Sequence, residues 1–234
     1  MLTYSPELVA SCRRVLLTYK LSTLTDQVTK LHQSRLKRMR RPGPFYVYLA
    51  RSGESKTYSE SGEQEGQRDW ILHPFYRHPE NLERTLVWIG FRMRFDVAPT
   101  SGLLLDHISI QLARGEQDIL PLLRAEWDCR DLRDGEFVHS QPHWHVYPAR
   151  LSSSLEPDPV DARWAAVQEQ LHLAMCARWH NISGFALHHA SPSTPQEVSD
   201  WLRDLLKYLR EQVAYVVRRV KLESPHGFAA PSGT

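Results

Sequence analysis

Three histidines and a tryptophan occur within the short stretch HSQPHWHVYP, residues 139–148, and imidazoles at this spacing can carry chemistry. One residue separates His143 from His145, so both side chains point to the same face if the segment is a β-strand. Two neighbouring imidazoles can share a metal ion, or one can donate a proton while the other accepts one. A solvated sheet surface without chemistry shows the same spacing, so the surrounding elements have to decide between these interpretations.

The segments before these histidines alternate apolar and polar residues with the period of β-strands. Four strands are predicted between residues 87 and 146, from VWIGFRMRFDV, DHISIQLA, LLRAEWDC and FVHSQPHWHV. The turns between them contain Pro99 to Gly102, Gly115 and Gly135. Connections this short favour an antiparallel meander.

The alternation divides these strands into an apolar face and a polar face. The apolar positions are Phe91, Met93, Phe95, Ile108, Ile110, Leu112, Ala125, Trp127, Trp144 and Val146. The polar positions are Arg92, Arg94, His107, Ser109, Gln111, Arg124, Glu126, Asp128, His139, His143 and His145. We therefore predict that the apolar face packs against helices and that the histidines share the other face with arginines and carboxylates.

The polar face is the predicted functional site. Its predicted catalytic residues are His143, His145, Arg124 and Glu126. Its predicted ligands for a divalent metal are His107, His143 and His145, with Glu126 or His139 as alternative members of the set. This combination predicts a phosphoester hydrolase or nuclease, in which arginine stabilises the negative charge that develops on the substrate.

Two alternatives to the metal site remain open on the same face. Without a metal, a histidine can transfer the proton while Arg92, Arg94 or Arg124 binds the phosphate. The other alternative has no catalytic function, because the arginines can form ordinary ion pairs with Glu126 or Asp96.

Helices are predicted before and after these strands in the sequence. Ser5, Pro6 and Glu7 are typical of a helix start, and we expect a long N-terminal helix that ends with the basic sequence KRMRR, residues 37–41, before Pro42. Thr194 begins a second helix with a regular apolar stripe. The fold class is α+β: a four-stranded antiparallel meander packed against a long N-terminal helix and C-terminal helices. We predict one domain over residues 1–222, a flexible polar loop near residues 52–69 and a frayed tail at 223–234.

Composition indicates a soluble cytoplasmic protein of bacterial type. Arginine greatly outnumbers lysine, as in proteins from GC-rich genomes, and no apolar run is long enough to cross a bilayer. Three cysteines are too few and too widely spaced for a disulfide framework. The net charge of +2 requires any nucleic-acid partner to be attracted by a local patch, for which KRMRR is the candidate. Stabilisation of a helix end is the alternative role of that patch, and the oligomeric state stays open.

Cys176 offers a second chemistry. His172 and His180 flank it at helical spacing, and an adjacent imidazole can lower the pKa of a thiol and activate it as a nucleophile. The alternative role is that of a small buried side chain in the core.

The order of the predicted elements resembles that of the ubiquitin-conjugating fold. The shared features are an N-terminal helix, a four-stranded meander, the Pro142-His143 pair near its end, a downstream cysteine and closing helices. The resemblance implies acyl transfer through Cys176, or a catalytically inactive relative that retains the fold for binding. A third class is a non-enzymatic module that binds a protein or a nucleic acid.

Overall fold

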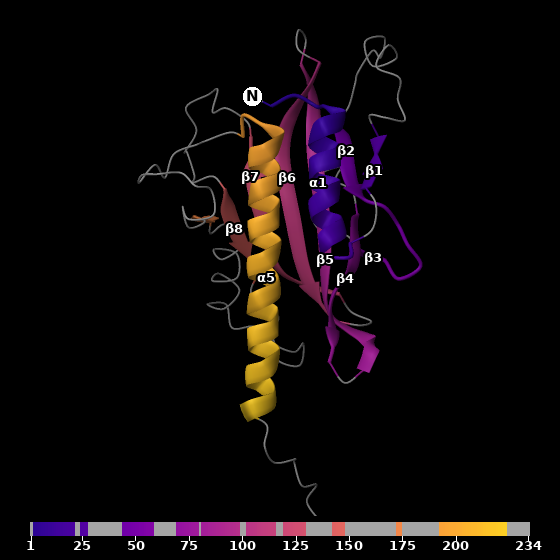
Figure 1. Ribbon diagram of the computed structural model, residues 1–234, viewed down its shortest axis with the longest axis vertical. Helices are drawn as coiled ribbons and strands as arrows, with labels where there is room; N and C mark the ends of the chain where they lie inside the picture. The colour runs from indigo at the N-terminus through magenta and orange to yellow at the C-terminus, as the bar shows by residue number, and fades with distance from the viewer. Residues whose placement is uncertain are drawn as a thin grey trace, which may run out of the picture.

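The computed structural model describes residues 2–21, 24–27, 44–58, 69–79, 81–98, 102–115, 119–129, 142–147, 172–174 and 192–223. Its helices are α1 (Pro6–Thr18) and α5 (Pro195–Glu223) (Figure 1). Its strands are β1 (Leu24–Asp26), β2 (Phe45–Leu49), β3 (Lys56–Tyr58), β4 (Trp70–His78), β5 (Asn81–Ala98), β6 (Gly102–Arg114), β7 (Leu120–Asp128), β8 (His143–Val146) and β9 (His172–Ala174).

The described strands form one nine-stranded antiparallel sheet in the order β1-β2-β5-β6-β7-β8-β9. Strand β5 is 18 residues long, so one of its edges pairs first with β4 and then with β2, and β3 pairs with β4. The predicted α+β class and the antiparallel run from β5 to β8 are confirmed. The prediction of four strands is wrong. Strand β2 is buried along nearly its whole length and β4 along its first half, so neither alternates clearly between an apolar and a polar face.

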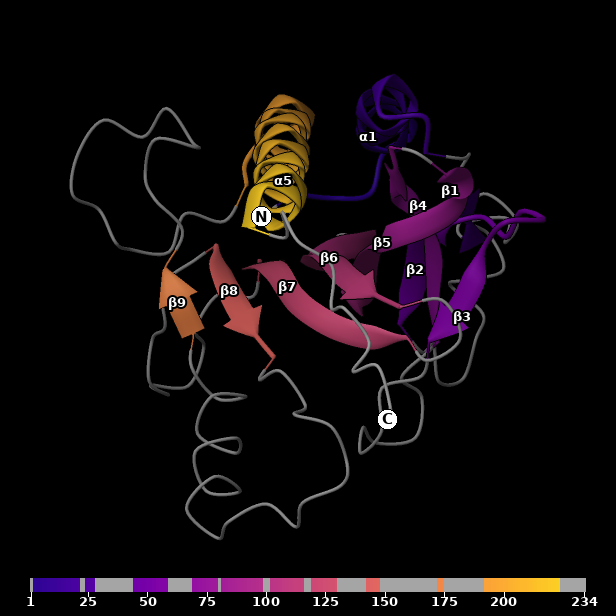
Figure 2. The same ribbon diagram turned by 90° about the horizontal axis from the view of Figure 1, so that it is seen from below.

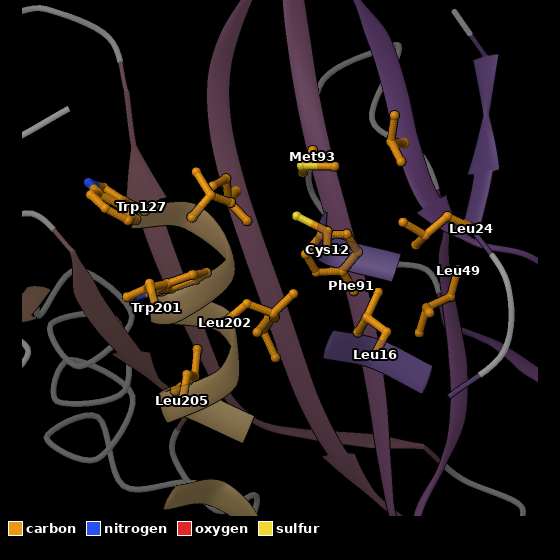
Figure 3. Close-up of a cluster of buried hydrophobic side chains, with 14 of the residues drawn as sticks. Cys12, Leu16, Leu24, Leu49, Phe91, Met93, Trp127, Trp201, Leu202 and Leu205 are labelled. Carbon is orange, nitrogen blue, oxygen red and sulfur yellow. The ribbon is translucent and has the colours of Figure 1, made fainter. Parts of the chain in front are cut away.

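Both helices lie side by side over one face of the sheet (Figure 2). That face carries the apolar positions predicted on β5, β6 and β7, all of which are buried. Figure 3 shows their contact with the helices, where Phe91 and Met93 lie near Cys12 of α1 and Trp127 lies near Trp201 of α5. The assignment of Val146 to the core is wrong: it is 44 % exposed, because it is the last residue of the short strand β8.

Helix α1 begins where it was predicted to begin, but it ends far earlier than the predicted end at residue 41. Ser5 accepts a hydrogen bond from the Leu8 N–H, but the helix stops at Thr18, so the prediction of a long N-terminal helix is wrong. Lys20 has a φ of 59°, and the N–H groups of Lys20 and Leu21 donate to the carbonyls of Leu17 and Leu16. This is a Schellman motif, which normally has glycine where Lys20 stands, and Leu21 is buried behind it.

Helix α5 begins at the predicted cap and covers the sheet with its first half. The Thr194 side chain accepts a hydrogen bond from the Glu197 N–H, and the Glu197 carboxylate accepts one from the Ser193 N–H. The buried positions of its apolar stripe are Val198, Trp201, Leu202, Leu205, Leu206 and Leu209. Beyond them the stripe emerges from the core, and Val216 is 54 % exposed.

Several predicted features lie outside the described residues. They are the basic cluster at 37–41, residues 59–68 of the predicted loop, His139, Cys176 and the tail at 224–234. Residues 56–58 of the predicted loop form β3. No described helix combines the length and the apolar composition needed to cross a bilayer.

Both described cysteines are expected to resist alkylation in the folded protein. Burial raises the pKa of Cys12 to about 12 and raises the pKa of Cys129 well above its ordinary value, so neither forms a thiolate at neutral pH. Iodoacetamide should label both thiols only after unfolding in urea, which peptide mass mapping before and after unfolding can measure. Rapid labelling of Cys12 in the folded protein would contradict its placement between α1 and the sheet.

Candidate metal centre

The polar side chains of the sheet stand in two adjacent rows that cross several strands. One row runs Arg92, Ser109, Glu126 and His143, from β5 to β8. The next row runs Gln111, Arg124 and His145, from β6 to β8. Residues opposite each other on neighbouring strands share a face, so the register brings residues distant in sequence into one site on the face opposite the helices.

Three side chains from β7 and β8 converge on one point. Nε2 of His143 lies 2.8 Å from Nε2 of His145, which lies 2.8 Å from Oε2 of Glu126. The third side of the triangle, from His143 Nε2 to Glu126 Oε2, is 3.8 Å. His143 and His145 are buried, and the Glu126 side chain is 17 % exposed. Among the described residues, these three form the group whose ligand atoms lie close enough to hold a metal ion.

The size of this triangle suits a first-row divalent metal. Its three sides define a point about 1.9 Å from all three atoms, while zinc lies about 2.0–2.2 Å from imidazole nitrogen and carboxylate oxygen. An ion slightly outside the plane of the three atoms therefore satisfies all three bonds.

Protons satisfy this arrangement less well than a metal does. A hydrogen on Nε2 of His145 can point to Glu126 or to His143, although both acceptors lie 2.8 Å away. A cation binds all three lone pairs at once.

The carboxylate of Glu126 is oriented by its neighbours. The Ser109 hydroxyl donates to Oε1 at 3.2 Å, and Nε of Arg124 lies 3.0 Å from the same oxygen. Oε2 is thereby turned towards the two histidines. Outer contacts of this kind fix the orientation of metal ligands and raise their affinity.

Glu126 is held in the ionised form that metal binding requires. Burial alone would raise the pKa of its carboxyl group, but the hydrogen bond with His145 and the positive charge of Arg124 more than offset burial. The net result is a pKa well below the ordinary value. The carboxylate is therefore available as a ligand at neutral pH.

The four residues predicted as catalytic, Arg124, Glu126, His143 and His145, all lie in this cluster. His107 shares the face, but it is not among the residues whose ligand atoms converge, and its Nδ1 lies 3.2 Å from Asp106. Glu126, which was predicted as an alternative ligand, is the third member of the group in place of His107.

The other two arginines of the polar face have different surroundings. Nε of Arg94 lies 3.3 Å from Asp96 and 3.2 Å from Asp106, which matches the ion pairing considered as an alternative. The guanidinium of Arg92 lies over the rings of Trp70 and Tyr46, 4.3 Å and 5.9 Å from their centroids. Neither arrangement places a guanidinium at the metal centre.

Two residues of the site were not predicted as functional. Ser109 was predicted on the same polar face as Glu126, but only the strand register shows that the two residues are directly opposite each other. Asp106 falls at a register irregularity between β5 and β6, which alternation cannot reveal.

Comparison of the chain with protein-family models, with curated proteins and with solved structures finds no match. The function proposed for this fold therefore depends on the chemistry of the site.

Proposed function

We propose that this protein is a metal-dependent phosphoester hydrolase. Glu126, His143 and His145 bind a divalent cation, and Arg124 contributes a second positive charge beside it. The observation that carries the proposal is the convergence of Oε2 and the two Nε2 atoms on one point at metal-ligand distance.

The number of ligands in the described cluster favours catalysis over a structural role. Structural zinc sites are closed by four protein ligands, whereas catalytic sites have three and leave a position for water or substrate. The described cluster supplies three ligands. A metal with an open position lowers the pKa of bound water and generates a nucleophile near neutral pH.

The charge of the site favours an anionic substrate. A divalent metal outweighs the single carboxylate of Glu126, and Arg124 lies against that carboxylate with a side chain that is 14 % exposed. Positive groups fixed in place stabilise the extra negative charge on phosphorus oxygens in the transition state. Phosphate monoesters and diesters, including nucleic acid, are the substrate class that this arrangement suits.

The direct test is hydrolysis with defined metals. The protein is stripped with a chelator, reloaded with Zn²⁺, Mn²⁺ or Mg²⁺, and assayed with 4-nitrophenyl phosphate, bis(4-nitrophenyl) phosphate and single-stranded DNA. His143→Ala and His145→Ala should each lose bound metal, measured by elemental analysis, and more than about 100-fold in activity, because loss of an outer contact alone already costs 10–100-fold.

His78→Ala is the matched control, because His78 lies on β4 outside the cluster and should retain both metal and activity. Metal binding without hydrolysis of any of these substrates would contradict the proposed reaction. Oxygen-dependent turnover with Fe²⁺ would assign the same ligands to an oxygenase instead.

A further inference from the structure

His107 is a third histidine on this sheet face. Its Nδ1 has a partner, and its Nε2 has none among the described residues. Nδ1 of His107 lies 3.2 Å from Oδ2 of Asp106, which is buried and also lies 3.2 Å from Nε of Arg94. An ionised carboxylate only accepts hydrogen bonds, so Nδ1 carries the hydrogen and Nε2 carries the lone pair. The pair of Asp106 and His107 fixes the tautomer of the imidazole.

Nε2 of His107 is buried and has no hydrogen-bond partner in the part of the chain that the structure describes. Most buried polar atoms are paired, because an unpaired one loses its hydration without compensation. An imidazole nitrogen with a lone pair can accept a hydrogen bond, and the O–H of a water molecule is the smallest donor that can supply one.

His107 of β6 is the diagonal neighbour of Glu126 on the adjacent strand β7. Ser109, two residues further along β6, is directly opposite Glu126 of β7. Diagonal neighbours on a sheet are about 7–8 Å apart, within reach of long side chains. The register therefore places His107 on the same face of the sheet as the cluster, on the strand next to that of Glu126.

We infer that His107 is the general base of the hydrolysis, an inference that rests on the proposed function. The oxygen of the attacking water forms a bond to phosphorus while the bond from phosphorus to the leaving oxygen breaks. The proton of the water passes to Nε2 of His107, the leaving oxygen takes a proton from solvent, and the imidazolium later returns its proton to solvent. Asp106 is a positioning residue, because it holds the ring in the reactive tautomer.

The test separates proton transfer from metal binding. In the metal-loaded full-length protein, His107→Ala should lower kcat by about 100-fold, the lower end of the range for general-base catalysis. Its dissociation constant for Co²⁺, followed by the visible absorption of the bound ion, should be unchanged. Added imidazole should restore much of the lost kcat, and it should not affect His78→Ala.

Each other outcome overturns a different statement. An unchanged kcat in His107→Ala, with hydrolysis intact, rejects the general-base role and leaves the proposed function standing. Weakening of Co²⁺ binding by more than about 10-fold makes His107 a part of the metal site instead. Absence of hydrolysis in the metal-loaded wild-type protein rejects the proposed function, and the role of His107 is rejected with it.

Discussion

Saturation with Zn²⁺ is expected to raise the free energy of unfolding by about 2.7 kcal/mol when the free metal is at 100 times its dissociation constant. The reason is linkage: the three ligand atoms converge only in the folded sheet, so the metal binds the native state and stabilises it. For a chain of this length the increase corresponds to roughly 5–10 °C in Tm. Thermal unfolding followed by circular dichroism, with and without metal, measures the shift.

The same shift should disappear on acidification. The lowered pKa of Glu126 keeps its carboxylate ionised as the pH falls through the ordinary range of a glutamate, so this ligand is lost only at lower pH. Metal ligands must be deprotonated to bind, so metal affinity and the metal-induced rise in Tm both fall as the pH is lowered.

Matched variants identify the origin of the shift. Glu126→Gln and His143→Ala should abolish the metal-induced increase in Tm, whereas His78→Ala should retain it. An unchanged Tm with Zn²⁺, Mn²⁺ and Co²⁺ would show that the three side chains form a hydrogen-bonded network and bind no metal.

Trp201→Ala should lower the free energy of unfolding by about 3–5 kcal/mol, the range found for large aromatic residues removed from cores. Trp201 is fully buried in α5, and its ring centroid lies 5.7 Å from that of Trp127 on β7 (Figure 3). Native domains are stable by only about 5–15 kcal/mol, so this one side chain accounts for a large share of the total. Urea unfolding monitored by circular dichroism measures the loss.

Two further variants distinguish packing from other causes. Trp201→Phe should cost less than Trp201→Ala, because the indole N–H has no hydrogen-bond partner among the described residues and most of the ring volume is kept. Tyr215→Ala on the same helix should change stability by less than about 0.5 kcal/mol, because Tyr215 is 54 % exposed. Equal losses in Trp201→Ala and Tyr215→Ala would contradict the docking of α5 through its first half.

The strands that could be predicted are those with one apolar and one polar face. Alternation in β5, β6 and β7 identified Phe91, Ile108 and Trp127 as core residues, and all three are buried. Strands buried on both faces give no such signal, which is why β2 was not assigned. The end of α1 was missed because Lys20 adopts a backbone conformation for which glycine is the usual sequence signal.

The sequence allowed us to predict which sheet face carries the site, but not which side chains pair across the strands. The alternation of apolar and polar positions along each strand was enough to place Glu126, His143 and His145 on the same face of the sheet. Distances depend on register, and a single sequence does not specify register. The irregularity at Asp106 shows why: one additional residue in β6 changes every pairing beyond it, and it supplies the carboxylate that contacts His107.

The arrangement of the two helices has a consequence for synthesis of the chain on the ribosome. The hydroxyl of Tyr19, at the end of α1, donates to the carbonyl of Arg203 in α5, a residue 184 positions later. At 5–20 residues per second, translation needs roughly 10–40 s to extend from one to the other. In the later part of that interval, once β7 has been synthesised, the half of the sheet that α5 covers has no helix over it, and Trp127 lacks its partner Trp201. The nascent chain is therefore expected to expose an aggregation-prone surface until α5 has left the exit tunnel, and to depend on chaperones for that time.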